Sequence, residues 1–229
     1  MYFVHQVHRL RRRDASGFEA SVRDDLMGAI ATEPGARLIW YAWTIDAAVS
    51  HLEAITMVAV EDPAALTRLS ERTRSGDLAS IGARLDDLRV DVQTRIAKPL
   101  RYNPLNPSLA DVPTTAADHA TVGYMHDFVP PCIGQARGYE DAMSNIYMAM
   151  TDTELLDVVL WAGLEPVAGP VPEQMNISRI QRTDAVVKLI TDEFPRDIKK
   201  LGSWMFDALK VRDHWTTRLA RCASWSPLY

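Results

Sequence analysis

The sequence predicts an α+β protein made of two tandem ferredoxin-like repeats, each with the element order βαββααβ. Three observations support this prediction. A twelve-residue stretch recurs near the end of the chain, the first hundred residues give that order of elements, and some strands carry aromatic residues on both faces. Each repeat would cover the bare face of the other, so we expect the two antiparallel sheets to pack into one barrel within a single chain.

The recurring stretch is 94–105, which returns as 217–228 at an offset of 217 − 94 = 123 residues. Five of its twelve positions are identical. Other matches lie at nearly the same offset; His5 corresponds to His126, 121 residues later. Matches spread over predicted strands and helices indicate that one unit of about 120 residues is present twice.

The repeat defines the expected organisation of the chain. Residues 1–100 form the first repeat and residues 120–229 the second. Residues 101–119 contain three prolines and no periodicity, so we interpret them as a linker.

The first repeat opens with a strand and a helix. Residues 2–9 alternate aromatic and β-branched residues with polar ones, which is typical of a strand. Ser16 and Glu19 have the spacing of a capping box, so the helix is expected to begin at Ser16. Its apolar stripe consists of Phe18, Val22, Leu26 and Ile30. Pro34 and Gly35 end it.

The rest of the first repeat follows from short local signals. Strands are expected at 37–45 and 54–60, joined by a connection at 46–52. Asp62 before Pro63 is typical of a helix start, and another helix follows Gly76. The alternating residues of the last strand are Val90, Val92, Thr94 and Ile96.

Composition excludes several classes of protein. A net charge of −5 and a pI near 5.7 give no basic surface for nucleic acid. No apolar run approaches the roughly 20 residues that cross a bilayer, and the first residues lack a signal-peptide pattern. The two cysteines, Cys132 and Cys222, form neither a disulfide framework nor a metal-ligand spacing, so we expect a cytoplasmic protein without a metal site.

A family resemblance rests on the run GFEASVRDDLMGAIATEPGARLIWYAW, residues 17–43. This helix, ending in Glu33-Pro34-Gly35 and passing into a strand, resembles the dimeric α+β barrel superfamily, which includes antibiotic-biosynthesis monooxygenases and NIPSNAP-like proteins. The second repeat has Thr153-Glu154-Leu155 at the corresponding place. The superfamily contains oxygenases, isomerases, dehydratases and binding proteins, so the resemblance implies a fold more strongly than a reaction.

Tandem chains of this size with aromatic-rich strands resemble the ring-opening oxygenases of angucycline pathways, of the jadomycin, gilvocarcin and kinamycin type. This resemblance implies oxidation of a polycyclic aromatic polyketide by oxygen and reduced flavin. The sequence has no GxGxxG, HExxH, CxxC or GxSxG motif. Any FMN or FAD would therefore be a diffusible co-substrate, and heme, which some members bind, is not expected.

Three histidines are the candidate proton-handling residues. His5 and His126 occupy equivalent places in the first strand of each repeat, among apolar residues. His214 stands where the first repeat has Asp91, and a difference between matching copies is where two pockets would diverge. His8 shares the first strand with His5 but points to the other face. For His5 or His126 alone, a structural histidine in the core is also consistent with the pattern.

Aromatic side chains on strands would form the walls of a pocket for a flat ligand. Tyr41 and Trp43 share one face of their strand, and Trp40 lies on the other. The predicted substrate-binding residues are Tyr41, Trp43, Tyr124, Trp161 and, at the barrel mouth, His51. Each ring taken alone is also consistent with simple core packing.

The sequence therefore predicts an oxygenase acting on an angucycline-like aromatic in secondary metabolism. Three alternatives remain: a cofactor-independent oxygenase of the anthrone type, a non-catalytic barrel that binds a hydrophobic ligand, and an isomerase or cyclase. The expected partner is a small aromatic molecule, with neither nucleic acid nor membrane, and further pairing of two chains into a homodimer stays open.

Overall fold

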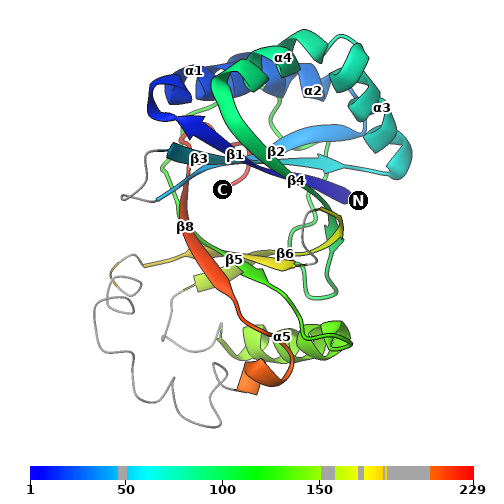
Figure 1. Cartoon of the computed structure of the whole chain (residues 1–229), viewed down its shortest axis with the longest axis vertical. Coiled ribbons are helices and arrows are strands. Elements are labelled where there is room, and N and C mark those ends of the chain that lie inside the picture. Colours follow the sequence, from blue (N-terminus) through cyan, green and yellow to red (C-terminus); the bar gives the residue numbers. More distant parts are fainter. Residues whose placement is uncertain (46–50, 151–157, 170–172, 183, 185–206) are drawn as a thin grey trace.

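The strands of the protein form one closed antiparallel barrel (Figure 1). The computed structural model describes residues 1–45, 51–150, 158–169, 173–182, 184 and 207–229. Within these residues the strands are β1 (Tyr2–Arg11), β2 (Ala36–Thr44), β3 (His51–Val60), β4 (Arg89–Pro99), β5 (Gly123–Val129), β6 (Val158–Ala168), β7 (Gln174–Ile180) and β8 (Thr216–Cys222). The predicted α+β class with an antiparallel barrel is confirmed.

The strand order around the barrel is β1-β3-β2-β8-β5-β7-β6-β4. Strands β1 to β4 therefore lie side by side in the order β4-β1-β3-β2, and β5 to β8 in the corresponding order β8-β5-β7-β6. Two further pairings, β2 with β8 and β4 with β6, close the barrel. Each half of the chain thus pairs its two edge strands with the edge strands of the other half. These pairings close the sheet into a barrel.

Helices cover the outside of the barrel. They are α1 (Ala15–Ala20), α2 (Met27–Ala31), α3 (Pro63–Ser75), α4 (Ala79–Leu88) and α5 (Ala136–Met150). Figure 1 shows α1 to α4 over the outer face of the β1–β4 sheet, and α5 on the opposite side of the molecule. Among the residues that the structure describes, no helix is long and apolar enough to cross a membrane.

Two large apolar clusters separate the inside of the barrel from its helical cover. The first, which we call the interior cluster, takes buried residues from all eight strands. The second, the outer cluster, packs the helices of the first half against the opposite face of their sheet. Leu105 and Val112, from the predicted linker at 101–119, are buried in the interior cluster. This stretch therefore contributes to the core as well as joining the halves.

The first helix begins earlier than the sequence suggests. A 3-10 turn at Arg12–Asp14 precedes α1, and no side chain caps it. The capping box of Ser16 and Glu19 was a wrong prediction, because the Glu19 carboxylate accepts instead from the indole N–H groups of Trp43, at 3.2 Å, and Trp225, at 2.7 Å. Glu19 thus ties the helix to β2 and to the C-terminal segment.

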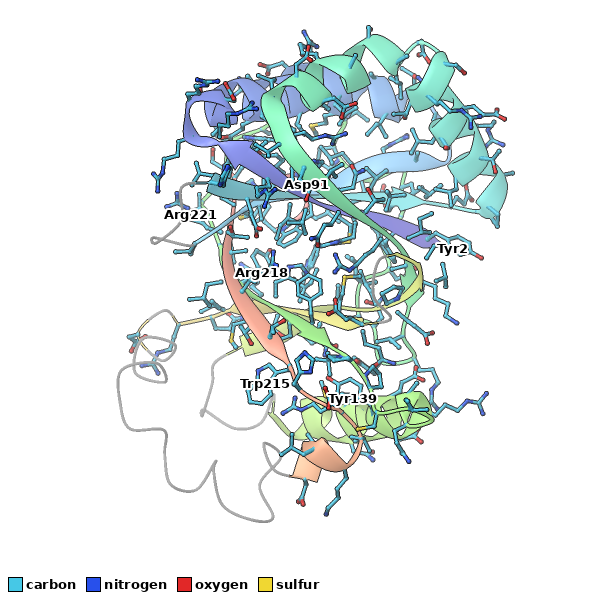
Figure 2. All side chains as sticks on the ribbon, in the orientation of Figure 1. Tyr2, Asp91, Tyr139, Trp215, Arg218 and Arg221 are labelled. Atoms are coloured by element: carbon cyan, nitrogen blue, oxygen red, sulfur yellow. The ribbon has the colours of Figure 1, made fainter. Side chains whose placement is uncertain are left out.

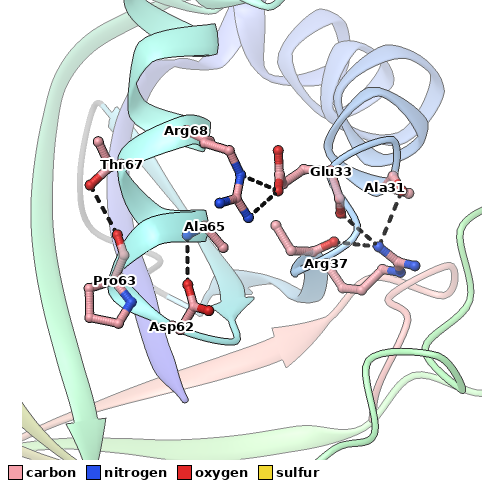
Figure 3. A network of polar contacts seen from close by, with 9 residues as sticks. Ala31, Glu33, Arg37, Asp62, Pro63, Ala65, Thr67 and Arg68 are labelled. Atoms are coloured by element: carbon pink, nitrogen blue, oxygen red, sulfur yellow. Dashed lines mark hydrogen bonds and ion pairs between the residues drawn. The ribbon is translucent and has the colours of Figure 1, made fainter.

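The Glu-Pro-Gly signature and the next helix start are held by the polar contacts in Figure 3. Buried Glu33 accepts from the Arg68 guanidinium of α3 at 2.9 Å, and Arg37 donates to backbone carbonyl groups that include that of Glu33. The Asp62 side chain accepts from the backbone N–H of Ala65 at 2.7 Å, which confirms the predicted helix cap. These contacts fix how α2 enters β2 and how α3 leaves β3.

Two features of the sequence prediction fall on residues outside the described part. Most of the predicted connection at 46–52 lies there, although His51 and Leu52 belong to β3. The segment Thr153-Glu154-Leu155, which replaces the Glu-Pro-Gly signature in the second half, lies there as well.

Candidate functional site

His5 and His126 lie side by side inside the barrel. Their ring centroids are 4.9 Å apart, and both side chains are 0% exposed. His5 lies between Phe3 and Val7 on the inward face of β1, and His126 lies between Tyr124 and Phe128 on β5. Strand alternation in each half therefore brings two equivalent positions together at the centre of the barrel.

Neither histidine has a hydrogen-bond partner among the described residues, at either ring nitrogen. Burial, followed by the nearby Arg95 and Arg218 charges, lowers the pKa of His5 to about 3. Burial, followed by His5 and the same two arginines, holds the pKa of His126 well below its usual value. Both rings are therefore neutral at pH 7, and each offers one N–H donor and one lone pair.

Two arginines lie opposite the histidines on the neighbouring strands. Arg95 of β4 is the cross-strand partner of His5, and Arg218 of β8 is the partner of His126. Their guanidinium carbons lie 4.7 and 5.5 Å from the centroid of the Phe128 ring. Figure 2 shows Arg218 on β8 between the two sheets. The interior therefore combines two neutral bases with two cations.

Each arginine is paired with a glutamate from the other half of the chain. Arg95 binds Glu173 at 3.1 Å, and Arg218 binds Glu53 at 2.5 Å. The side chains of the first pair are 6% and 17% exposed, and those of the second pair 38% and 31%. Arg95 is thus the more deeply buried cation of the two.

Neither arginine was predicted as a site residue, although the sequence carries a signal for both. Arg95 and Arg218 are identical positions of the recurring stretch and face inward on otherwise different strands. An arginine kept at equivalent inward positions among apolar neighbours is an unusual core residue, since isolated buried charges are costly.

A wall of aromatic rings continues from His126. Trp40 lies 6.2 Å from His126, 5.2 Å from Tyr124 and 5.5 Å from Trp161 between ring centroids. Tyr124 and Trp161 are 5.7 Å apart. The structure therefore brings the predicted residues Tyr124 and Trp161 together beside the histidines, with Trp40 between them.

Tyr41 and Trp43 lie on the wrong face to line the barrel. Tyr41 belongs to the outer cluster and packs against Trp225 at 4.8 Å, while Trp43 binds Glu19 under the helices. Alternation correctly separated them from Trp40, but the face chosen as the interior was wrong. A register shift between Leu38 and Trp40 in β2 also places two consecutive residues, Ile39 and Trp40, in the interior cluster.

His214 and His51 do not join the buried pair. The His214 side chain is 57% exposed, and its Nδ1 lies 2.8 Å from the Asp213 carboxylate just before β8. Its predicted place in a pocket was wrong, because the difference between the two repeats falls on the surface. His51 opens β3 opposite Arg11 and is half-buried. It lies in the strand, six residues before Met57, the cross-strand partner of His5.

A polar network lies under α5, on the outer face of the second sheet. The Tyr102 hydroxyl donates to Asn176 at 2.7 Å, and the Asn176 amide donates to Tyr139 at 3.0 Å. Figure 2 shows Tyr139 on the α5 side of the molecule. Asp127, on the same strand as His126, accepts from Thr217 at 2.6 Å, and burial raises its pKa to about 6.

A cleft of about 650 Å³ lies on the outer face of the first sheet, between β1, β3, β4 and the helices α3 and α4. Its lining includes Val4, Thr56, Leu69, Leu85 and Ile96. It contains none of the residues predicted for the site. Among the described residues, no group of three or more histidine, cysteine, aspartate or glutamate side chains is arranged to hold a metal ion.

Comparison with known proteins identifies the fold. No protein-family model and no curated protein sequence matches the chain. An anthrone oxidase-like protein has a similar structure, with a TM-score of 0.65 at 9% identity over 97% of this chain and 91% of that one. The chain has the dimeric α+β barrel fold.

Two other solved structures share this barrel. A protein described as a candidate monooxygenase from Lactobacillus acidophilus matches with a TM-score of 0.57 at 14% identity, over 100% of this chain and 99% of that one. Chlorite dismutase from Candidatus Nitrospira defluvii matches with a TM-score of 0.55 at 9% identity, over 97% and 90%. At such low identity the similarity concerns the fold alone, and the reaction must be argued from the site.

Proposed function

We propose that the protein is an oxygenase that oxidises a flat polycyclic aromatic substrate inside the barrel. The observation that carries the proposal is the pair of fully buried, unpartnered imidazoles, His5 and His126, beside the aromatic wall of Trp40, Tyr124 and Trp161. Aromatic rings bind a flat apolar ligand, and the few polar groups fix its orientation. The similarity to an anthrone oxidase-like protein supports the reaction class by analogy.

The residues suit the activation of a phenol or anthrone. A neutral imidazole with a free lone pair accepts a hydrogen bond from the substrate hydroxyl or enol and receives its proton as charge develops. The anion that remains is electron-rich and reacts with oxygen, and Arg95 and Arg218 stabilise its negative charge. The same positive charges lower the pKa of both histidines further, so the arginines assist the reaction by lowering the pKa of the bound substrate hydroxyl.

The electron balance separates two forms of the reaction. In the oxidation of an anthrone methylene to a ketone, one oxygen atom enters the substrate and the other leaves as water with the two methylene hydrogens, so no further reductant is required. Hydroxylation of a phenolic ring, or its opening by insertion of a single oxygen atom, needs two more electrons, which reduced FMN or FAD would supply when bound. The donors of Arg95 and of the two imidazoles suit the charge of a reduced flavin ring.

A more specific substrate follows from the sequence resemblance. We propose an angucycline-like polyketide in secondary metabolism, because the three-ring wall matches a ligand of several fused rings. We also infer that the two halves arose by tandem duplication, which is supported by their corresponding strand orders. A cytoplasmic location and a small-molecule partner without nucleic acid belong to the same proposal.

Heme has no role in the proposed reaction, in which the histidine pair handles the proton of the substrate itself.

Oxygen uptake with dithranol, a hydroxylated anthrone, tests the proposal. We expect uptake by the purified protein, with a product 14 mass units heavier than the substrate, and a fall of at least 100-fold in His5→Gln and His126→Gln, the range for loss of a general base. His214→Gln is the matched control. Repeating the assay with reduced FMN separates the flavin-dependent form from the cofactor-independent one.

Three outcomes would contradict the proposal. Equal uptake rates in the wild type and both interior variants would remove the histidines from the reaction. A product of unchanged mass would indicate an isomerase or cyclase. Tight binding of aromatic ligands without oxygen uptake, for dithranol and for quinols with reduced flavin, would indicate a carrier.

A further inference from the structure

Arg95 is a buried cation with unused hydrogen-bonding capacity. Its side chain is 6% exposed, and only Nη2 reaches the Glu173 carboxylate, at 3.1 Å. Its Nε and Nη1 atoms have no partner among the described residues. Since a buried guanidinium normally uses all its donors, these N–H groups are available to a ligand.

The free donors of Arg95 converge with those of the histidines. Arg95 lies directly across the β1–β4 pairing from His5, and His126 lies 4.9 Å beyond His5. The Arg95 guanidinium also lies over the face of the Phe128 ring, which belongs to the interior cluster. The donors thus come from three side chains: Arg95 and His5 lie on two strands of the first half, and His126 lies on a strand of the second half.

The charges around this point are unevenly placed. Glu173 and Glu53 are 17% and 31% exposed at the side chain, so their negative charge lies nearer to solvent than Arg95 does. Arg218 adds a second positive charge beside His126, and Tyr124 contributes a phenol whose pKa is raised by burial. The buried centre is therefore rich in N–H donors, and each of its two cations is paired with a glutamate carboxylate.

We propose that Arg95, His5 and His126 form an anion-binding subsite that holds the acidic oxygen of a flat hydroxyaromatic ligand as a phenolate or enolate. This inference rests on the proposed function for the kind of ligand that enters the barrel. On binding, the ligand O–H bond breaks, its electron pair stays on the oxygen, and the proton leaves to solvent. The planar guanidinium of Arg95 donates hydrogen bonds to one such oxygen, or to a neighbouring carbonyl and phenolate together.

Arg95 is assigned this role in preference to Arg218 on two grounds. Arg218 is more exposed, at 38% against 6%, so solvent screens its charge more strongly. Arg218 also sits closer to its glutamate, at 2.5 Å against 3.1 Å. We therefore expect the loss of Arg95 to affect an anionic ligand more than the equivalent loss of Arg218.

Alizarin, a dihydroxyanthraquinone whose colour reports its own ionisation, is a suitable probe. A spectrophotometric titration of bound alizarin from pH 5 to 9 measures its ionisation constant in the barrel. We expect the wild-type protein to raise this constant by about 10- to 100-fold over free dye, as a nearby opposite charge does. Arg95→Met should abolish the increase, Arg95→Lys should keep part of it, and Arg218→Met should reduce it less.

Two further variants complete the test. Arg101→Met, at a side chain that is 62% exposed, is the matched control and should leave the titration unchanged. Glu173→Gln removes the counter-charge of Arg95 and should raise the ionisation constant further, which provides a second readout if Arg95→Met does not fold. Bound dye that ionises like free dye, or equally in wild type and Arg95→Met, would overturn the subsite.

The outcomes for the subsite and for the oxygenase are distinguishable. Ionised alizarin in the wild type, lost in Arg95→Met, supports the subsite even if dithranol oxidation is never observed. Oxygen uptake without any change in dye ionisation supports the oxygenase and overturns the subsite.

Discussion

The three buried histidines of β1 and β5 share their burial and a lowered pKa, but they differ in the hydrogen bonds that their rings make. His5, His126 and His8 are 0%, 0% and 2% exposed, and the pKa values of His5 and His8 are both lowered to about 3. His8, on the helical face of β1, contacts Thr56 at 2.9 Å and Arg89 at 3.0 Å through its two ring nitrogens. His5 and His126 have no such partners among the described residues. Burial and a lowered pKa are therefore common to these histidines, and the number of hydrogen bonds separates the interior pair from His8.

The difference in hydrogen bonding affects the free energy of folding. A buried polar atom without a partner costs on the order of 1 to 3 kcal/mol, and a partnered one adds about 1 kcal/mol to stability. On the helical side of the sheet, the hydrogen bonds of His8 join β1 to β3 and β4. The barrel interior keeps two unsatisfied rings, which favours a role in binding or chemistry for them over one in packing.

Replacing an interior histidine gives the sharpest test of this comparison. His126→Leu and His5→Leu should each lower dithranol oxidation by about 100- to 10,000-fold, because the proton acceptor is lost. The same variants should keep or gain about 1 kcal/mol of unfolding free energy in urea, because an unsatisfied polar group is removed. Variants that lost several kcal/mol while keeping activity would reverse the assignment.

The pH dependence of stability should follow the same three residues. Their pKa values in the folded state lie well below 6.5, so at pH 5 the unfolded chain binds about three more protons, and stability falls as pH falls. Asp127 opposes this, since its folded pKa of about 6 exceeds 3.8. The net difference of about two protons corresponds to about 3 kcal/mol per pH unit near pH 5.

Urea unfolding at pH 7, 6 and 5 measures this slope. His5→Leu and His8→Leu should each reduce it by about one proton, and Asp127→Asn should steepen it. Stability that rises as the pH falls from 7 to 5 would show that Asp127 dominates and that the histidines do not have lowered pKa values in the folded state.

Replacing His8 should affect stability and leave the reaction alone. His8→Leu leaves the Thr56 hydroxyl and the Arg89 guanidinium without their partner, which should cost about 1 to 3 kcal/mol of unfolding free energy. Dithranol oxidation should stay within about threefold of the wild type. A loss of activity as large as that of His126→Leu would mean that the helical face takes part in the chemistry.

The smallest effects are expected from replacing each of two tryptophans of β2. Trp40→Phe should raise the KM for dithranol by about 3- to 10-fold, as loss of part of an apolar contact does. Trp43→Phe should leave KM unchanged and cost about 1 kcal/mol of stability, since it breaks the hydrogen bond to Glu19. Equal KM effects in the two variants would show that both faces of β2 contact the substrate.

The sequence was sufficient for the α+β class and for the antiparallel barrel. The recurring stretch and the alternation of β1 predicted that His5 and His126 hold equivalent inward positions. It could not say which face of β2 is interior, because both faces are covered by apolar groups and alternation alone does not rank them. The register shift beside Trp40 depends on pairing with β3, which lies beyond local sequence signals.

Long-range partners account for the other errors. Glu19 matched a local capping pattern but bonds to Trp43 and to Trp225, which lies 206 residues away. His214 differed between the repeats, which suggested a pocket, but its neighbourhood is surface. The roles of Arg95 and Arg218 emerged only when the strand pairings placed them beside the histidines.

The closure of the barrel through β2–β8 and β4–β6 bears on how the chain folds as it leaves the ribosome. Strands β2 and β4 are synthesised before β6 and β8, yet their outer edges find partners only when those later strands have emerged. Until then the first sheet has two open edges, the kind of surface on which chains aggregate. Slow elongation between β4 and β8 would lengthen this exposure, so production of the protein should respond to chaperone supply more than its final stability suggests.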